Sequence, residues 1–171
     1  MHQSPITTHR LGGSLALPFR NMYEHTINIR VRYPEVDAMG YLHHSRYLQY
    51  FEMGRVELLR SLGHSYADLE KAGVFFVVVK AEVKYKAPAK YDDELTLTTR
   101  LVKQTHVRYD HTYELKRGTT MLAEGATTIA CVDREGQLTR ATDEVLESMT
   151  LEQLLEHVNR ASGVQQQMYY I

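Results

Sequence analysis

The stretch VRYPEVDAMGYLHHSRYLQYFEMGRVELLRSLG, residues 31–63, decides the fold of this chain. From Ser45 onward it repeats apolar residues at helical spacing, which predicts one long amphipathic helix that ends at Gly63 in a left-handed cap. Gly54 falls on the apolar stripe, where alanine would favour the helix by about 1 kcal/mol. We therefore expect another backbone to approach the helix very closely at Gly54. The stripe consists of Tyr47, Phe51, Leu58 and Leu62, widened by Leu48 and Leu59.

A short, turn-rich loop precedes this helix and carries Asp37, Gly40, His43 and His44. We expect the helix to begin at Ser45 or His44, either of which suits a helix N-terminus. A helix start leaves backbone N–H groups unpaired and carries the positive end of the helix dipole. An acidic, histidine-bearing loop at that end predicts a place where chemistry can occur.

Composition excludes several function classes. The chain has 171 residues, enough for one domain with its own core, and a formal net charge of −1, which favours neither nucleic acid nor a membrane surface as a partner. No apolar run is long enough to cross a bilayer. Cys131 is the single cysteine, so no internal disulfide is possible, and a reducing cytoplasm is the expected compartment.

We expect three regions along the chain. Residues 1–22 indicate a poorly ordered arm, because their apolar stretch is too short and contains a proline, unlike a signal peptide. Residues 23–160 should form one domain, and residues 161–171 a weakly determined tail. A second helical pattern covers residues 143–159.

The domain contains five strand-like segments and a short helical piece over residues 65–71. Residues 74–86 begin with VFFVVV, which is apolar on both faces and predicts a strand whose first half is buried on both sides. Residues 121–133 are rich in small side chains, as in a central strand that lies against a helix, and Cys131 should be part of that core. The strand-like segments are residues 23–33, 74–86, 94–104, 107–116 and 121–133.

These elements predict an α+β fold. Short turns join the strands that follow the long helix, so those strands should form an antiparallel meander, and the first strand should pair into the same sheet. The single long helix would fill the concave face of this curved sheet. The edges and apolar surface that remain favour a homo-oligomer, a homodimer or homotetramer.

The loop and helix resemble a known signature. The signature consists of Asp37-Ala-Met-Gly40, three residues, His44, two residues and Tyr47, followed by Tyr50-Phe51-Glu52. It is similar to the signature of the hotdog-fold acyl-CoA thioesterases, in the branch of 4-hydroxybenzoyl-CoA thioesterase and the YbgC-type enzymes. The resemblance extends over residues 24–140. It implies a hotdog fold, in which a curved antiparallel five-stranded sheet wraps around one long central helix, and an acyl-CoA substrate. The matching segments also include residues 55–57, 83–89, 93–95 and 132–133.

Thioester hydrolysis needs a nucleophile or general base and donors for the oxyanion. Asp37 can supply the carboxylate in either role, and the backbone N–H groups near His44, at the helix start, suit the oxyanion. The resemblance implies the same assignment, with Gly40 turning the loop between them. No GxSxG motif offers a serine nucleophile.

We expect Tyr47 and His43 to contact the substrate. At the position of His43, relatives commonly carry tyrosine or asparagine. Coenzyme A is phosphorylated, so basic side chains should lie near the pocket mouth. Candidates are Lys86 and Lys90, with Lys84 and Arg117. We expect no cofactor, and no metal, because His43 and His44 lack further ligands at suitable spacing.

Alternatives remain open for these residues and for the function. Asp37 alone would more often be a turn former or helix cap, and the His44 ring can be purely structural. Glu52 and Arg55 could form a surface ion pair. A hotdog-fold dehydratase or hydratase, and a non-catalytic acyl-thioester-binding protein, are the competing functions. An acyl carrier protein thioester could replace acyl-CoA as the substrate.

Overall fold

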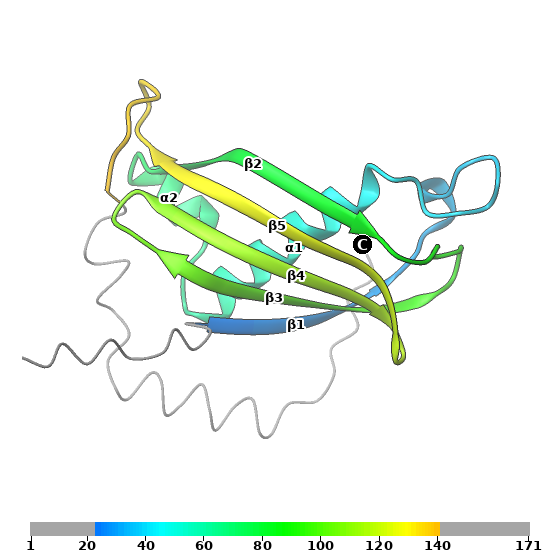
Figure 1. Ribbon diagram of the computed structural model, residues 1–171. Coiled ribbons are helices and arrows are strands. Elements are labelled where there is room, and N and C mark those ends of the chain that lie inside the picture. The colour runs from blue at the N-terminus through cyan, green and yellow to red at the C-terminus, as the bar shows by residue number, and fades with distance from the viewer. Residues whose placement is uncertain (1–22, 141–171) are drawn as a thin grey trace, which may run out of the picture.

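The computed structural model describes residues 23–140, which form a curved antiparallel sheet wrapped around one long helix (Figure 1). The strand order is β1-β3-β4-β5-β2. The helix α1 crosses the concave side of the sheet, and the loop before it lies at the opposite end of the sheet from α2. The elements are β1 (Tyr23–Arg30), the 3-10 turn η1 (Tyr33–Glu35), α1 (Arg46–Ser61), α2 (Tyr66–Lys71), β2 (Phe75–Tyr85), β3 (Glu94–Gln104), β4 (Arg108–Arg117) and β5 (Thr120–Val132).

These bounds confirm the predicted elements within residues 23–140. β3 has the predicted ends, and the other strands and α2 differ from prediction by one to three residues at one end or at both. α1 begins at Arg46 and ends at Ser61, and Gly63 has the positive φ of 87° expected of a left-handed cap. The predicted arm (1–22), the helical pattern over 143–159 and the tail (161–171) lie outside the described residues.

The predicted meander is correct only for β3, β4 and β5. β2 pairs with β5 rather than with β3, although β2 precedes β3 directly in the chain. The edge of β3 that β2 would need is occupied by β1, which pairs with β3 from Tyr23↔Leu101 to Arg30↔Glu94. Since β1 takes that edge, β2 is placed at the far side of the sheet.

The core lies between α1 and the sheet. Phe51 is fully buried and stacks on Tyr113 of β4, with ring centroids 4.4 Å apart and planes at 7°. The ring of Phe51 lies directly over Gly125 of β5, where a Cβ would come within 2.2 Å of it. The small residues of β5 therefore leave room for the helix, as their pattern predicted. Cys131 is buried in a second hydrophobic cluster.

The buried face of α1 differs from the predicted stripe at three positions. Tyr50 is buried, with 2% exposure, although it lay outside the stripe. Leu48 is 42% exposed, although it was assigned to the apolar stripe. Arg55 is buried, with 6% exposure, and its Nη1 donates to the hydroxyl of Tyr113, so it is not the surface partner of Glu52. At Gly54 the close approach is real, but the approaching atoms belong to the Thr99 and Leu97 side chains rather than to a backbone.

The first half of β2 is not buried on both faces. Val74 is buried, but Val77, Val78 and Val79 are 39%, 53% and 60% exposed. The reason is the strand order, because β2 is an edge strand with a single described neighbour, β5. An exposed apolar edge strand of this kind is unusual in a monomeric protein.

Candidate active site

A tight hairpin, residues 36–42, positions Asp37 ahead of α1. Val36 and Leu42 form an antiparallel bridge, and the Asp37 N–H donates to the Tyr41 carbonyl over 2.8 Å. The Gly40 N–H donates back to the Asp37 carbonyl, and the φ of Gly40 is +75°, a conformation that favours glycine. Gly40 thus turns the loop, as the sequence predicted.

The carboxylate of Asp37 is partly occupied in holding this hairpin. Its Oδ1 accepts the backbone N–H groups of Met39 at 2.9 Å and of Tyr41 at 3.2 Å. The turn-forming role is therefore real. The second oxygen, Oδ2, bonds to none of the described residues, and the side chain is only half-buried. One oxygen therefore holds the hairpin, and the other is left without a bond from the described residues.

Glu35, which sequence reasoning did not single out, fastens the base of the hairpin to α1. Its side chain is 2% exposed and accepts from the Arg32 backbone N–H at 2.7 Å, the Arg32 guanidinium at 2.8 Å and the Tyr50 hydroxyl at 2.7 Å. The Glu35 carbonyl accepts the His43 N–H at 2.9 Å. Burial alone would raise the pKa of Glu35, but the bonds from Arg32 and Tyr50 outweigh it and lower that pKa. A glutamate three residues after an arginine gave no clear signal in the sequence.

We expect Glu35→Gln to destabilise the protein by about 1–3 kcal/mol, because an amide group would turn an N–H donor toward groups that also donate. Since the folded-state pKa of Glu35 is lowered, its stabilisation is complete above the ordinary glutamate pKa and is lost as the pH falls through the lowered folded-state value. Urea unfolding at pH 7 and in the acid range measures both effects. Glu135→Gln, at an exposed loop position, is the matched control, and an equal loss in both variants would contradict this role.

The start of α1 faces the same loop. Ser45 occupies the N-cap position without a side-chain cap bond to the helix, because its hydroxyl instead bonds Nδ1 of His43 at 2.8 Å. No described residue accepts a hydrogen bond from the His44 N–H, whereas the His44 carbonyl accepts the Tyr85 hydroxyl at 3.0 Å. An unpaired N–H at the positive end of a helix is suited to an oxyanion.

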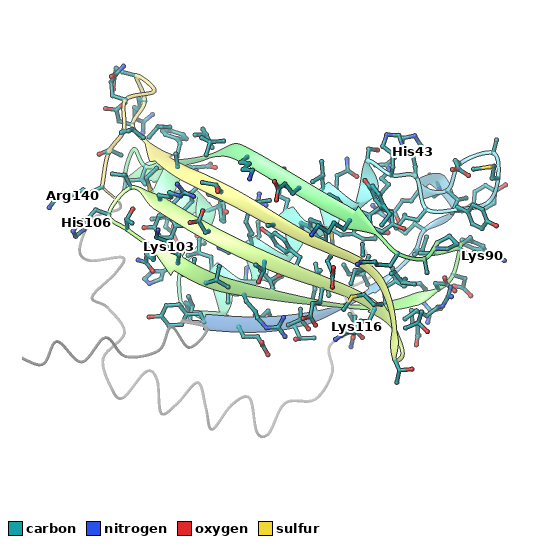
Figure 2. All side chains as sticks on the ribbon, in the orientation of Figure 1. His43, Lys90, Lys103, His106, Lys116 and Arg140 are labelled. Atoms are coloured by element: carbon teal, nitrogen blue, oxygen red, sulfur yellow. The ribbon has the colours of Figure 1, made fainter. Side chains whose placement is uncertain are left out.

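The two histidines and Tyr47 occupy different environments. The rings of His43 and His44 lie 4.1 Å apart and are both exposed, and His43 stands outward from the loop in Figure 2. Tyr47 is buried and packs edge-on against Tyr85, with centroids 5.0 Å apart. Burial raises the pKa of Tyr47, so its hydroxyl stays neutral at physiological pH.

The predicted basic residues are divided between this end of the molecule and the sheet surface. Lys90 lies beside the hairpin, with its Nζ 5.9 Å from the centre of the Tyr41 ring, and it is drawn at the same end as His43 (Figure 2). Lys86 forms an ion pair with Glu124 at 3.2 Å, and Arg117 is bonded to Asp93. Of these, Lys90 is best placed beside the Asp37 hairpin.

Residues 23–140 contain no group of three or more histidines, cysteines or carboxylates arranged to hold a metal ion. Within the same residues, no helix is long and apolar enough to span a membrane. The polar groups described around the hairpin are the carboxylates of Asp37 and Glu35, the imidazole rings of His43 and His44, and the start of α1.

Comparisons with known proteins identify the family. A sequence model of the thioesterase-like superfamily matches residues 31–159. The acyl-CoA thioesterase YbgC of Haemophilus influenzae is 37% identical over 108 residues, 61% of this chain and 78% of that protein. The YbgC acyl-CoA thioester hydrolase of an Escherichia coli O6:H1 strain is 34% identical over 106 residues, 61% of this chain and 79% of that protein.

A solved structure gives the same answer for the fold. A DHNA-CoA thioesterase from Staphylococcus aureus superposes with a TM-score of 0.71 at 26% identity, covering 86% of this chain and all of that one. The curved five-stranded sheet around α1 is thus the hotdog fold, as the loop and helix signature implied. The chain belongs to the thioesterase-like superfamily and is a thioester hydrolase.

Proposed function

We propose that this chain hydrolyses acyl-CoA thioesters at the site formed by the 36–42 hairpin and the start of α1. The proposal rests on two observations, an unbonded carboxylate oxygen, Oδ2 of Asp37, in the hairpin and an unpaired N–H, that of His44, just before α1. These are the two kinds of group that thioester hydrolysis requires, a base or nucleophile and an oxyanion donor. The YbgC relatives, which are named as acyl-CoA thioesterases, support coenzyme A as the carrier.

Asp37 acts either as a general base or as a nucleophile. As a general base, its Oδ2 takes a proton from water while the water oxygen attacks the thioester carbonyl. As a nucleophile, Oδ2 attacks that carbonyl itself, and water then hydrolyses the mixed anhydride. In both routes the carbon–sulfur bond breaks, the thiol of coenzyme A leaves, and the products are a free acid and CoA.

The surroundings suit this substrate. Negative charge that develops on the thioester oxygen would accept the His44 N–H, at the positive end of α1. Tyr47 and His43 would border the acyl group. Lys90, beside Tyr41, is the cation best placed for a CoA phosphate, whereas Lys86 is already paired with Glu124.

The competing functions fit less well. A dehydratase or hydratase moves protons α to the thioester and uses a histidine together with a carboxylate, but the His43 ring is bonded to Ser45 rather than to Asp37. A binding protein without activity would not need the unbonded oxygen of Asp37. A panel of acyl-CoA thioesters, assayed by detection of released thiol with enoyl-CoA hydration measured in parallel, separates the functions. Hydration without thiol release would contradict the proposal.

We further propose that the chain is a homo-oligomer joined through β2. The edge of β2 presents Val77, Val78 and Val79, and a second copy that pairs along this edge would extend the sheet and cover them. The end of β2 also approaches the proposed site, since the Tyr85 hydroxyl bonds the His44 carbonyl. We therefore expect both subunits to contribute to each site.

Val79→Lys should convert the oligomer to monomers at micromolar concentration and lower its activity, as measured by light scattering and thiol release. Leu138→Lys is the control, because Leu138 is similarly exposed but lies outside the strands. A fully active monomeric wild-type protein would rule out the assembly.

A further inference from the structure

A second polar site lies at the other end of α1 from Asp37. A cavity of about 80 Å³ opens there between the last turns of α1, α2 and the sheet. Its walls combine leucine, isoleucine, phenylalanine and tyrosine side chains with a few polar ones, and none of its lining residues belongs to the 36–42 hairpin. Arg55 is nine residues beyond the start of α1, roughly 14 Å along the helix axis. The cavity is therefore distinct from the proposed catalytic site.

Arg55 brings a positive charge into this cavity without a negative partner. Its side chain is 6% exposed, and no carboxylate within residues 23–140 forms an ion pair with it. Its contact with the Tyr113 hydroxyl is long, at 3.3 Å, and its Nε has no hydrogen-bond partner among the described residues. A buried charge without a counter-charge is costly, and such a charge is normally paired.

Burial disfavours the charged form of Arg55, but the Tyr113 and Tyr66 hydroxyls outweigh this and raise its pKa above the ordinary value. The guanidinium is therefore charged at every physiological pH. The same cavity contains two further unsatisfied groups, the hydroxyl of Tyr109, whose side chain is 8% exposed, and Nδ1 of His111. Burial, with the nearby Arg55, lowers the pKa of His111 to about 3, so this ring is neutral.

We infer that this cavity binds the carboxylate of a small organic acid with an apolar body. One cation and a hydroxyl donor match a single carboxylate, which accepts several hydrogen bonds. The apolar walls match a hydrocarbon body rather than a phosphate or sulfate. A closed apolar cavity of about 150 Å³ accepts benzene, which has six heavy atoms, so 80 Å³ holds about three heavy atoms, the carboxylate group of the acid. The short hydrocarbon body would then extend along the apolar side chains at the open side of the cavity.

The ligand is a free acid, not the end of an acyl group held at Asp37. An acyl chain that reached Arg55 from the start of α1 would need to extend roughly 14 Å, far longer than a short acid. Free acids are also what the proposed hydrolysis releases, but binding at Arg55 does not depend on that activity.

The test is calorimetric titration of the full chain with butyrate and with butyramide, which has the same size but no charge. We expect butyrate to bind at one site per chain and butyramide at least tenfold more weakly. Saturating the protein with free coenzyme A should leave the butyrate affinity unchanged. Equal affinity for the amide, no binding of butyrate at millimolar concentration, or displacement by coenzyme A would overturn the inference.

Variants assign the binding to the cavity. Arg55→Met should lower the butyrate affinity at least tenfold, whereas Arg60→Met, which removes an exposed guanidinium from the same helix, should not change it. Should Arg55→Met fail to fold, Tyr109→Phe removes a single oxygen and should still lower the affinity several-fold. Two results together would contradict the assignment. Folded Tyr109→Phe would bind butyrate as tightly as the wild type, and Arg55→Met would either bind it as tightly or fail to fold. Because titration needs no turnover, a protein without thioesterase activity would still give this result.

Discussion

Gly54→Ala is expected to destabilise the protein by about 1–3 kcal/mol, the range for an overpacked core, although alanine is the better helix former. A Cβ at residue 54 would lie 2.2 Å from the Thr99 hydroxyl oxygen and 2.9 Å from a Leu97 methyl group. Both side chains belong to β3 and are buried, so α1 would have to move away from the sheet to make room. That movement would also loosen the contact of Phe51 with Gly125 and Tyr113.

Urea unfolding measures this loss, and a double-mutant cycle identifies its cause. Thr99→Ala removes the nearer of the two clashing atoms, the Thr99 hydroxyl oxygen, which has no hydrogen-bond partner among the described residues. Gly54→Ala should therefore cost less in the Thr99→Ala background than in the wild type. Gln49→Ala, on the exposed face of the same helix, should stay within about 0.5 kcal/mol of the wild type. A Gly54→Ala protein as stable as Gln49→Ala would show that the helix–sheet contact is not tight.

Local patterns were sufficient for most of the fold because each described element carries its own periodicity. The ends of β3 were predicted without error, and the small residues of β5 correctly indicated a strand beneath a helix. The order of strands was harder to predict. Nothing in residues 74–86 shows that β1 takes the edge of β3, so the place of β2 in the meander and the burial of Val77–Val79 were predicted wrongly.

The candidate site was predictable where a turn and a helix start meet in sequence. Asp37, Gly40 and His44 are close in the chain, and their pattern predicted a turn-rich loop before the helix, while the resemblance implied their roles. Groups that act through distant partners gave no such signal. For Arg55 the sequence suggested only a surface ion pair with Glu52 as one alternative, because its partner, Tyr113, lies far along the chain in β4. Glu35 and His111 were missed for the same reason.

Asp37→Asn should lose on the order of 10²-fold or more in kcat, the scale of a removed general base. The substitution is well suited to this structure, because the asparagine Oδ1 can still accept the N–H groups of Met39 and Tyr41 and hold the hairpin. Only the charge and the unbonded oxygen are lost. We therefore expect unchanged stability and a KM close to that of the wild type.

Two controls make the assignment specific. Asp68→Asn replaces an exposed carboxylate at the start of α2, at the opposite end of the sheet, and should leave turnover unchanged. His44→Ala keeps the backbone N–H and should reduce kcat much less than Asp37→Asn, if the ring takes no part in the chemistry. A large loss in Asp68→Asn would show that the assay reports general damage instead.

The most direct test is the rate of thiol release from the best acyl-CoA of the panel, measured side by side for wild type and Asp37→Asn. We expect turnover by the wild type and a kcat on the order of 10²-fold lower for the variant, at similar KM and equal melting temperature. A variant that turns over within a few-fold of the wild type would contradict this expectation, and the catalytic group would then lie elsewhere.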